Sequence, residues 1–110
     1  MIIAIHTQYR ENYGTDDQPY WKYKGGDTFI VEGFSLPLDS NIGTSAQAIV
    51  DMVRPTIEYR NPMSEVYMLD WEISLDDNYM SMDAKLQLEF DGKIEYPDPR
   101  ININTLSQAA

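Results

Sequence analysis

Residues 65–75 read EVYMLDWEISL and form the most regular stretch of the sequence. Apolar side chains recur there at every second position, and acidic or polar side chains occupy most positions between them. This alternation is typical of a β-strand with one face on a core and the other in water. We therefore predict a central strand of an antiparallel sheet, with Asp70 and Glu72 on its wet face. The predicted apolar face consists of Tyr67, Leu69, Trp71, Ile73 and Leu75.

Other segments carry further strand signals. Residues 2–7 are rich in Ile, and residues 27–34 contain Phe29, Ile30 and Val31, so each segment is predicted to be a strand. Residues 20–24 read YWKYK, which alternates aromatic with basic side chains. Because Gly25 and Gly26 follow, and paired glycines favour two-residue turns, we predict a hairpin that joins 20–24 to 27–34. Two shorter segments, 93–96 and 101–103, are predicted to add a short strand and an edge strand.

The strongest helix signal lies in residues 44–60. Thr44 or Ser45 can cap the first turn. Pro55 should kink or end the helix, because proline lacks the backbone donor and crowds the preceding turn. An apolar stripe at helical spacing is formed by Ala46, Ile49, Val50, Val53 and Ile57.

Residues 81–91 fit two elements. Met82, Leu86 and Phe90 would share one face of a helix, whereas Leu86, Phe90 and their neighbours Ala84 and Leu88 also alternate as a strand would. We favour a short helix that ends at Asp91-Gly92, since glycine is the usual residue just past a helix end.

These elements predict an α+β fold in a single domain spanning residues 1–110, with an antiparallel sheet packed against the 44–60 helix. The length of 110 residues and the 43% hydrophobic content are sufficient for one core. No apolar run approaches the roughly 20 residues of a membrane span, and the N-terminus lacks the features of a signal peptide. With no cysteine in the chain, a cytoplasmic location is the simplest expectation.

The charge is large and unevenly distributed. The chain has 18 acidic and 8 basic residues, a formal net charge of −10. Residues 1–60 hold eight acids and five bases, whereas residues 61–110 hold ten acids and three bases. Direct nucleic-acid binding and an anionic membrane surface are disfavoured, because both need clustered Lys and Arg. A basic protein partner is favoured by electrostatics, although surplus acids also serve only to keep a protein soluble.

The acids of the C-terminal half are the leading candidate for a binding surface. Alternate residues of a strand lie about 6.5–7 Å apart, which is close to the spacing of phosphates along a nucleic-acid strand. Asp70 and Glu72 match that spacing, so a surface built around them would imitate a phosphate backbone. The candidate acidic face consists of Asp70, Glu72, Asp76, Asp77, Asp83, Glu89 and Asp91, with Glu95 and Asp98 as further members.

A second candidate site lies in the N-terminal third. His6 is the only histidine, and Arg10 beside it suggests a general base with an anion clamp. The interleaved bases and aromatics of residues 20–24 are a pattern that stacks nucleobases and holds phosphates, although hairpin aromatics also pack across strands. The expected ligand is a nucleotide-sized anion or a protein loop. The candidate set is His6, Tyr9, Arg10, Asn12, Tyr13, Trp21, Lys22 and Lys24.

Motifs of enzymes and cofactors are not recognisable. No Ser or Cys nucleophile stands in a known turn, and no second histidine offers a metal pair. The EF-hand spacing and a phosphate-binding glycine-rich loop are both missing. We therefore predict no catalytic residue, no metal site and no cofactor, and we favour a function other than catalysis.

The segments IHTQYRENYG and YWKYKGGDTFIVE near the N-terminus, with the later LQLEFDGKIEYP, resemble a group of small proteins encoded by bacteriophages and related mobile elements. No reaction is assigned to that group, so no functional residue is carried over from it. The resemblance implies a phage or plasmid accessory protein, acting in the cytoplasm of the host cell.

Three functions remain open. The first is a non-enzymatic inhibitor whose acidic face occupies a basic groove of a host nucleic-acid enzyme, as anti-restriction and anti-CRISPR proteins do. The second is a nucleotide or small-anion binding protein that uses the region around Tyr9, Arg10, Trp21 and Lys22. The third is a structural or adaptor module that works as a homodimer, with exposed aromatics, Met80 and Met82 at its interface.

Overall fold

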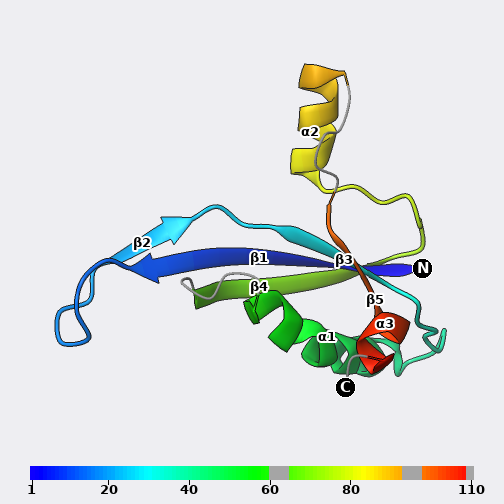
Figure 1. Cartoon of the computed structure of the whole chain (residues 1–110). Coiled ribbons are helices and arrows are strands. Elements are labelled where there is room, and N and C mark those ends of the chain that lie inside the picture. Colours follow the sequence, from blue (N-terminus) through cyan, green and yellow to red (C-terminus); the bar gives the residue numbers. More distant parts are fainter. Residues whose placement is uncertain (60–64, 93–97, 109–110) are drawn as a thin grey trace.

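The computed structural model describes residues 1–59, 65–92 and 98–108, and it shows a five-stranded sheet with three helices (Figure 1). The predicted α+β class, with a sheet packed against one main helix and a second short helix, is confirmed. One strand pair, β3 with β5, is parallel, so the sheet is mixed. In chain order the elements are β1 (Ile2–Asn12), β2 (Trp21–Lys24), β3 (Thr28–Glu32), α1 (Ile42–Tyr59), β4 (Glu65–Ser74), α2 (Met82–Asp91), β5 (Arg100–Asn102) and α3 (Ile103–Gln108).

The central strand is β1. It pairs with β4 along one edge and with β3 and then β2 along the other, and all three pairings are antiparallel. Ile2, Ile3 and Ile5 are fully buried, as expected for a strand covered on both faces. Among the described strands β4 pairs only with β1. The prediction that residues 65–75 form the central strand is therefore wrong, because β4 lies at an edge.

Helix α1 covers one face of the sheet, below it in Figure 1. The predicted apolar stripe is confirmed: Ala46, Val50, Val53 and Ile57 are each 0% exposed and pack with Ile3, Ile5, Phe29 and Val31 of the sheet. The helix begins at Ile42, two residues before the predicted start, and continues through Pro55 to Tyr59. The alternative in which Pro55 ends the helix is therefore wrong. Burial of the stripe on both sides of Pro55 outweighs the local cost of the proline.

Gly25 and Gly26 do not form the predicted hairpin turn. β2 and β3 both run antiparallel to β1 on the same edge, and the three residues between them oppose only two residues of β1. The segment is thus a bulge in one returning strand. A Cβ on Gly26 would lie 1.8 Å from the carbonyl oxygen of Thr7, so glycine is required there for close backbone approach. The Thr7 backbone N–H and hydroxyl both donate to the Asp27 carbonyl oxygen at 2.9 Å.

A second bulge lies beside the same part of β1, on its other edge, where β4 pairs with it. Gln8 opposes Met68 and Tyr9 opposes Val66, so Tyr67 is the extra residue. Of the predicted apolar face of β4, Leu69, Trp71 and Ile73 pack against the core, whereas Tyr67 and Leu75 are exposed. The bulge shifts the alternation by one residue, and Val66 takes the core position instead.

The C-terminal part resolves the ambiguity at 81–91 in favour of a helix. Ser81 caps α2 by accepting a hydrogen bond from the Ala84 N–H, and Gly92 ends it with a left-handed φ of 72°. The strand alternative for this segment is wrong. The predicted strand 93–96 lies outside the described residues. Residues 100–102 form the predicted edge strand, but Ile103 begins α3 rather than extending that strand.

Candidate functional site

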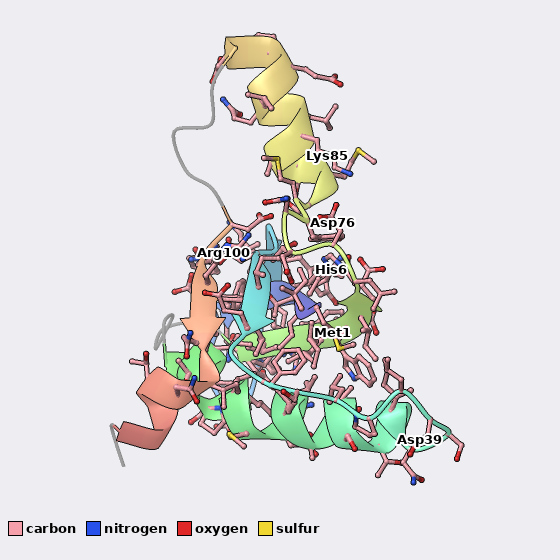
Figure 2. The ribbon with its side chains drawn as sticks, turned by 90° about the vertical axis from the view of Figure 1, so that its right-hand side faces the viewer. Met1, His6, Asp39, Asp76, Lys85 and Arg100 are labelled. Carbon is pink, nitrogen blue, oxygen red and sulfur yellow. The ribbon has the colours of Figure 1, made fainter. Side chains whose placement is uncertain are left out.

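We call the sheet face opposite α1 the open face. Because side chains alternate along a strand, β1 sends Ile3 and Ile5 toward α1 and sends His6, Gln8 and Arg10 to the open face. Figure 2 shows His6 on the side of the sheet that points toward α2. Asp70 is the register partner of His6 and therefore shares the open face with it.

A chain of polar contacts crosses the middle of the open face. The His6 ring nitrogen Nδ1 lies 3.0 Å from Thr28 Oγ1, and Nε2 lies 3.2 Å from Glu72 Oε1. The Tyr79 hydroxyl donates to the same Glu72 oxygen at 2.7 Å. These contacts tie three strands to the loop that leads into α2. Thr28 and Tyr79 were missed by sequence reasoning, because only the strand register and the loop path bring them beside His6.

The pKa values in this cluster follow from those contacts. Hydrogen bonds from Tyr79 and then from His6 lower the pKa of Glu72 below its ordinary value. Burial, together with the bond to Glu72, raises the pKa of Tyr79 to about 12. Glu72 is therefore an ionised acceptor at neutral pH, and Tyr79 is a neutral donor to it.

The far end of the open face carries an aromatic platform around Arg10. The guanidinium carbon of Arg10 lies 4.1 Å from the ring centroid of Trp21 and 5.3 Å from that of Tyr67. Tyr67 in turn meets the ring of Tyr23 edge-on, with centroids 5.0 Å apart. Arg10 Nε donates to Glu65 Oε2 at 3.0 Å. The predicted anion clamp is thus already paired with a carboxylate, and Glu65, Tyr23 and Tyr67 were absent from the predicted set.

The lysines of the same segment lie on the other face. Lys24 is the register partner of Tyr9, which is only 4% exposed and faces the α1 side with a hydroxyl that lacks a hydrogen-bond partner in the described part of the chain. Lys24 Nζ lies 2.7 Å from Glu11 Oε2. A hydrogen bond from Lys24, and then one from Tyr13, lowers the pKa of Glu11.

Lys22 lies above two tyrosine rings, with Nζ 4.9 Å from the Tyr13 centroid and 5.8 Å from the Tyr20 centroid. The structure therefore divides the second candidate set between two faces. His6, Arg10, Asn12 and Trp21 belong to the open face; Tyr9, Tyr13, Lys22 and Lys24 belong to the other. Asn12 closes the loop, since its Oδ1 accepts from the backbone N–H of Gly14 and Tyr20 at 2.8 and 2.9 Å.

The carboxylates of the candidate acidic face differ in whether they already hold intramolecular hydrogen bonds or ion pairs. Asp76 Oδ1 accepts from the Asn78 N–H at 2.9 Å, and Asp77 pairs with the N-terminal amine. Asp91 accepts from Gln87, and Asp98 accepts from the N–H and hydroxyl of Ser81. Glu95 lies outside the described residues.

Three acids remain without such contacts. In the part of the chain that the structure describes, the carboxylates of Asp70, Asp83 and Glu89 make no hydrogen bond or ion pair. Asp70 lies on the open face, whereas Asp83 and Glu89 lie on α2. These carboxylates are exposed and are available to a cationic partner.

Helix α2 is the most unusual element of this side. It stands away from the sheet, on the side opposite α1 (Figure 1), and Ala84 is its only buried residue. Phe90 is 89% exposed, and Met82, Leu86 and Leu88 are exposed as well. A surface hollow on α2 is lined by Asp83, Leu86, Gln87, Glu89 and Phe90. The helix therefore presents apolar and acidic side chains together.

A small cavity lies where α2 meets the sheet. Its volume is about 160 Å³, and its lining includes Ile30, Tyr79, Met80 and Arg100. Arg100 donates to Glu32 Oε2 at 3.0 Å and to the Asp77 carbonyl oxygen at 3.1 Å, so its charge is already compensated. Within the described ranges, no group of three or more His, Asp and Glu side chains is placed to hold a metal ion.

Comparisons with protein families, with curated proteins and with solved structures find no match. In residues 1–59, 65–92 and 98–108, no helix combines the length and apolar character needed to cross a membrane.

Proposed function

We propose that this protein is a small, acidic, non-enzymatic inhibitor that binds a basic, nucleic-acid-acting protein of a host cell. The observation that carries the proposal is α2, a capped helix that exposes apolar and acidic side chains together and buries only Ala84. Folded chains rarely leave large apolar side chains exposed on one element without a partner. The resemblance of the N-terminal third to phage and mobile-element proteins supports a partner among host defence proteins.

The composition of α2 indicates the chemistry of the partner. Leu86 and Phe90 are four residues apart and project from one side of the helix, which is the anchor spacing of helices that bind in an apolar groove. Asp83 and Glu89 line the same surface hollow. A groove with an apolar floor and Lys or Arg at its rim satisfies both features, and the net charge of −10 accelerates the encounter with it.

The acidic face of the proposal is therefore centred on α2. Asp83 and Glu89 are free for direct contact, and Asp70 extends the negative surface onto the open face. Glu72, Asp76, Asp77 and Asp91 contribute to the local negative potential, while their carboxylates also hold intramolecular bonds. The small-anion and homodimer alternatives remain predictions. In the small-anion site, Arg10 pairs with Glu65, Lys24 pairs with Glu11, and Lys22 lies over tyrosine rings.

The proposal is tested by capture from host lysate at several salt concentrations. Immobilised wild-type protein should retain a basic, nucleic-acid-binding protein at about 50 mM salt and lose most of it at about 500 mM, because exposed charges are screened. The double variant Leu86→Ser/Phe90→Ser should lose the partner at every salt concentration. Asp83→Asn/Glu89→Gln should weaken capture and flatten its salt dependence.

Two matched controls keep this experiment interpretable. Leu38 is 81% exposed far from α2 in the chain, so Leu38→Ser removes an exposed apolar side chain without touching the helix. Asp17→Asn removes one exposed charge from the loop between β1 and β2. Both controls should capture as the wild type does. Recovery of only acidic or salt-insensitive proteins, or equal loss in control and α2 variants, would show that the proposal is wrong.

A further inference from the structure

The outer edge of β4 is a long unpaired strand edge. Residues 68–74 oppose residues 2–8 of β1 without interruption, which makes a regular stretch of about 23 Å. Within the described ranges, the backbone of β4 bonds only to β1. The N–H and C=O groups that point away from β1 are therefore open to another strand.

This edge lacks several of the features that usually prevent strand addition. Edge strands are normally short or carry charged side chains, especially Lys, or a proline or a bulge. β2 has four residues, of which two are lysines, and β5 has three residues and begins with Arg100. The stretch 68–74 contains no Lys, Arg or proline, and the bulge at Tyr67 lies outside it. Its only charged side chains are the acids Asp70 and Glu72, which oppose an acidic strand and favour a cationic one. Of the edges that the structure describes, this one is the best prepared to accept a strand.

The side chains along the edge define what an added strand must contain. On the α1 side, Leu69, Trp71 and Ile73 pack against the core but remain partly exposed, and the Trp71 indole N–H donates to Gln47 of α1. On the open face, Asp70 and Glu72 alternate with them. A complementary strand would place apolar residues beside the first group and cationic residues beside the acids.

A second copy of the chain does not meet this requirement. Two antiparallel β4 strands that keep their apolar faces together overlap most fully in three registers. These registers oppose Asp70 to Glu72, Asp70 to itself, or Glu72 to itself. Like charges directly opposite each other destabilise strand pairs, and each copy carries a net charge of −10.

We propose that the outer edge of β4 binds an extended segment of a basic protein as an added strand. The segment carries Lys or Arg at alternate positions, beside Asp70 and Glu72, and apolar residues between them. Backbone hydrogen bonds to residues 68–74 supply affinity, and the alternating side chains supply specificity. This inference rests on the proposed function, in that it gives the same basic partner a second contact besides α2.

The test uses a defined peptide in place of the unidentified partner. A capped peptide of alternating Lys and Val is added to the full-length protein, and amide hydrogen exchange is followed by NMR. Every second amide within 68–74 should exchange at least about tenfold more slowly, because only alternate N–H groups point outward. The same peptide with alternate backbone nitrogens methylated retains its side chains but cannot form the ladder, and it should give no protection.

Substitutions locate the peptide contact on β4 and separate the strand-addition proposal from the proposed function. Asp70→Lys should weaken peptide binding about fivefold, whereas Asp17→Lys, in an exposed loop, should not. Leu86→Ser/Phe90→Ser should leave protection of 68–74 intact. Unchanged exchange in 68–74, or equal protection by the methylated peptide, would overturn the strand-addition proposal. Protection of 68–74 without salt-sensitive capture from lysate would overturn the proposed function and leave the edge proposal standing.

Discussion

The two longer helices lie on opposite sides of one sheet and differ in the burial of their apolar residues. α1 buries Ala46, Val50, Val53 and Ile57 completely, whereas α2 buries only Ala84 and leaves Phe90 almost fully exposed. Burial of a large apolar side chain contributes about 1.5–3 kcal/mol, so α1 stabilises the fold and α2 contributes little to it. The comparison indicates that the apolar residues of α2 serve another role, for which we propose partner binding.

The strongest test of this difference is truncation of a buried residue of α1. Ile57→Ala removes a fully buried side chain from the core and should lower the free energy of unfolding by about 3 kcal/mol. The midpoint of urea unfolding, followed by circular dichroism, measures this change. A loss below about 1 kcal/mol would mean that α1 does not form the core contact described here.

The next effect concerns the bulge at Gly26, between β2 and β3. Gly26→Ala should destabilise the protein by about 2 kcal/mol, because the added methyl group meets the Thr7 carbonyl oxygen and the backbone must shift. Gly25→Ala is the matched control, since a Cβ there has nothing within 4 Å, and it should stay within about 0.5 kcal/mol of wild type. Equal effects of the two substitutions in urea unfolding would contradict the bulge.

A smaller effect is expected on the open face, at Glu72. Its side chain is about half exposed, at 53%, so solvent screening limits its contribution. Glu72→Gln should cost about 0.5–1 kcal/mol at pH 7. Because the folded-state pKa of Glu72 is lowered, this contribution is complete above the ordinary value of 4.5 and is lost as the pH falls below it.

The difference in unfolding free energy between wild type and Glu72→Gln, measured by urea unfolding, should therefore shrink as the pH falls below 4.5. Asp70→Asn is a suitable control, as that neighbouring carboxylate makes no bond within the described residues. If this difference in unfolding free energy instead grows as the pH falls, the contacts of Glu72 with His6 and Tyr79 are not its cause.

The smallest effect on stability is expected on α2. Phe90→Ala should change the free energy of unfolding by no more than about 0.5 kcal/mol, since the side chain is 89% exposed. The same variant should lose partner capture. Destabilisation comparable with that of Ile57→Ala would show that α2 packs as α1 does, and the contrast between the two helices would disappear.

Local periodicity predicted the elements but not their neighbours. The alternation of β4 was read correctly over Leu69, Trp71 and Ile73 and failed at Tyr67, where a bulge shifts the strand by one residue. Trp21 and Tyr23 fall on one face of the sheet, whereas Lys22 and Lys24 fall on the other, where Lys22 meets Tyr20. The segment YWKYK therefore does not make the single mixed surface that the sequence suggested. Thr28, Glu65 and Tyr79 carried no signal, because their partners are distant in the chain.

The sequence by itself determined the α+β class, the apolar stripe of α1 and the strong negative charge, since each depends on composition or on residues within a few positions of one another. Only the tertiary structure decided that β1 is central, that Gly25 and Gly26 make a bulge, that the outer edge of β4 is unpaired and that α2 stands clear of the core. The physical reason is that strand pairing and burial are set by contacts between segments far apart in the chain.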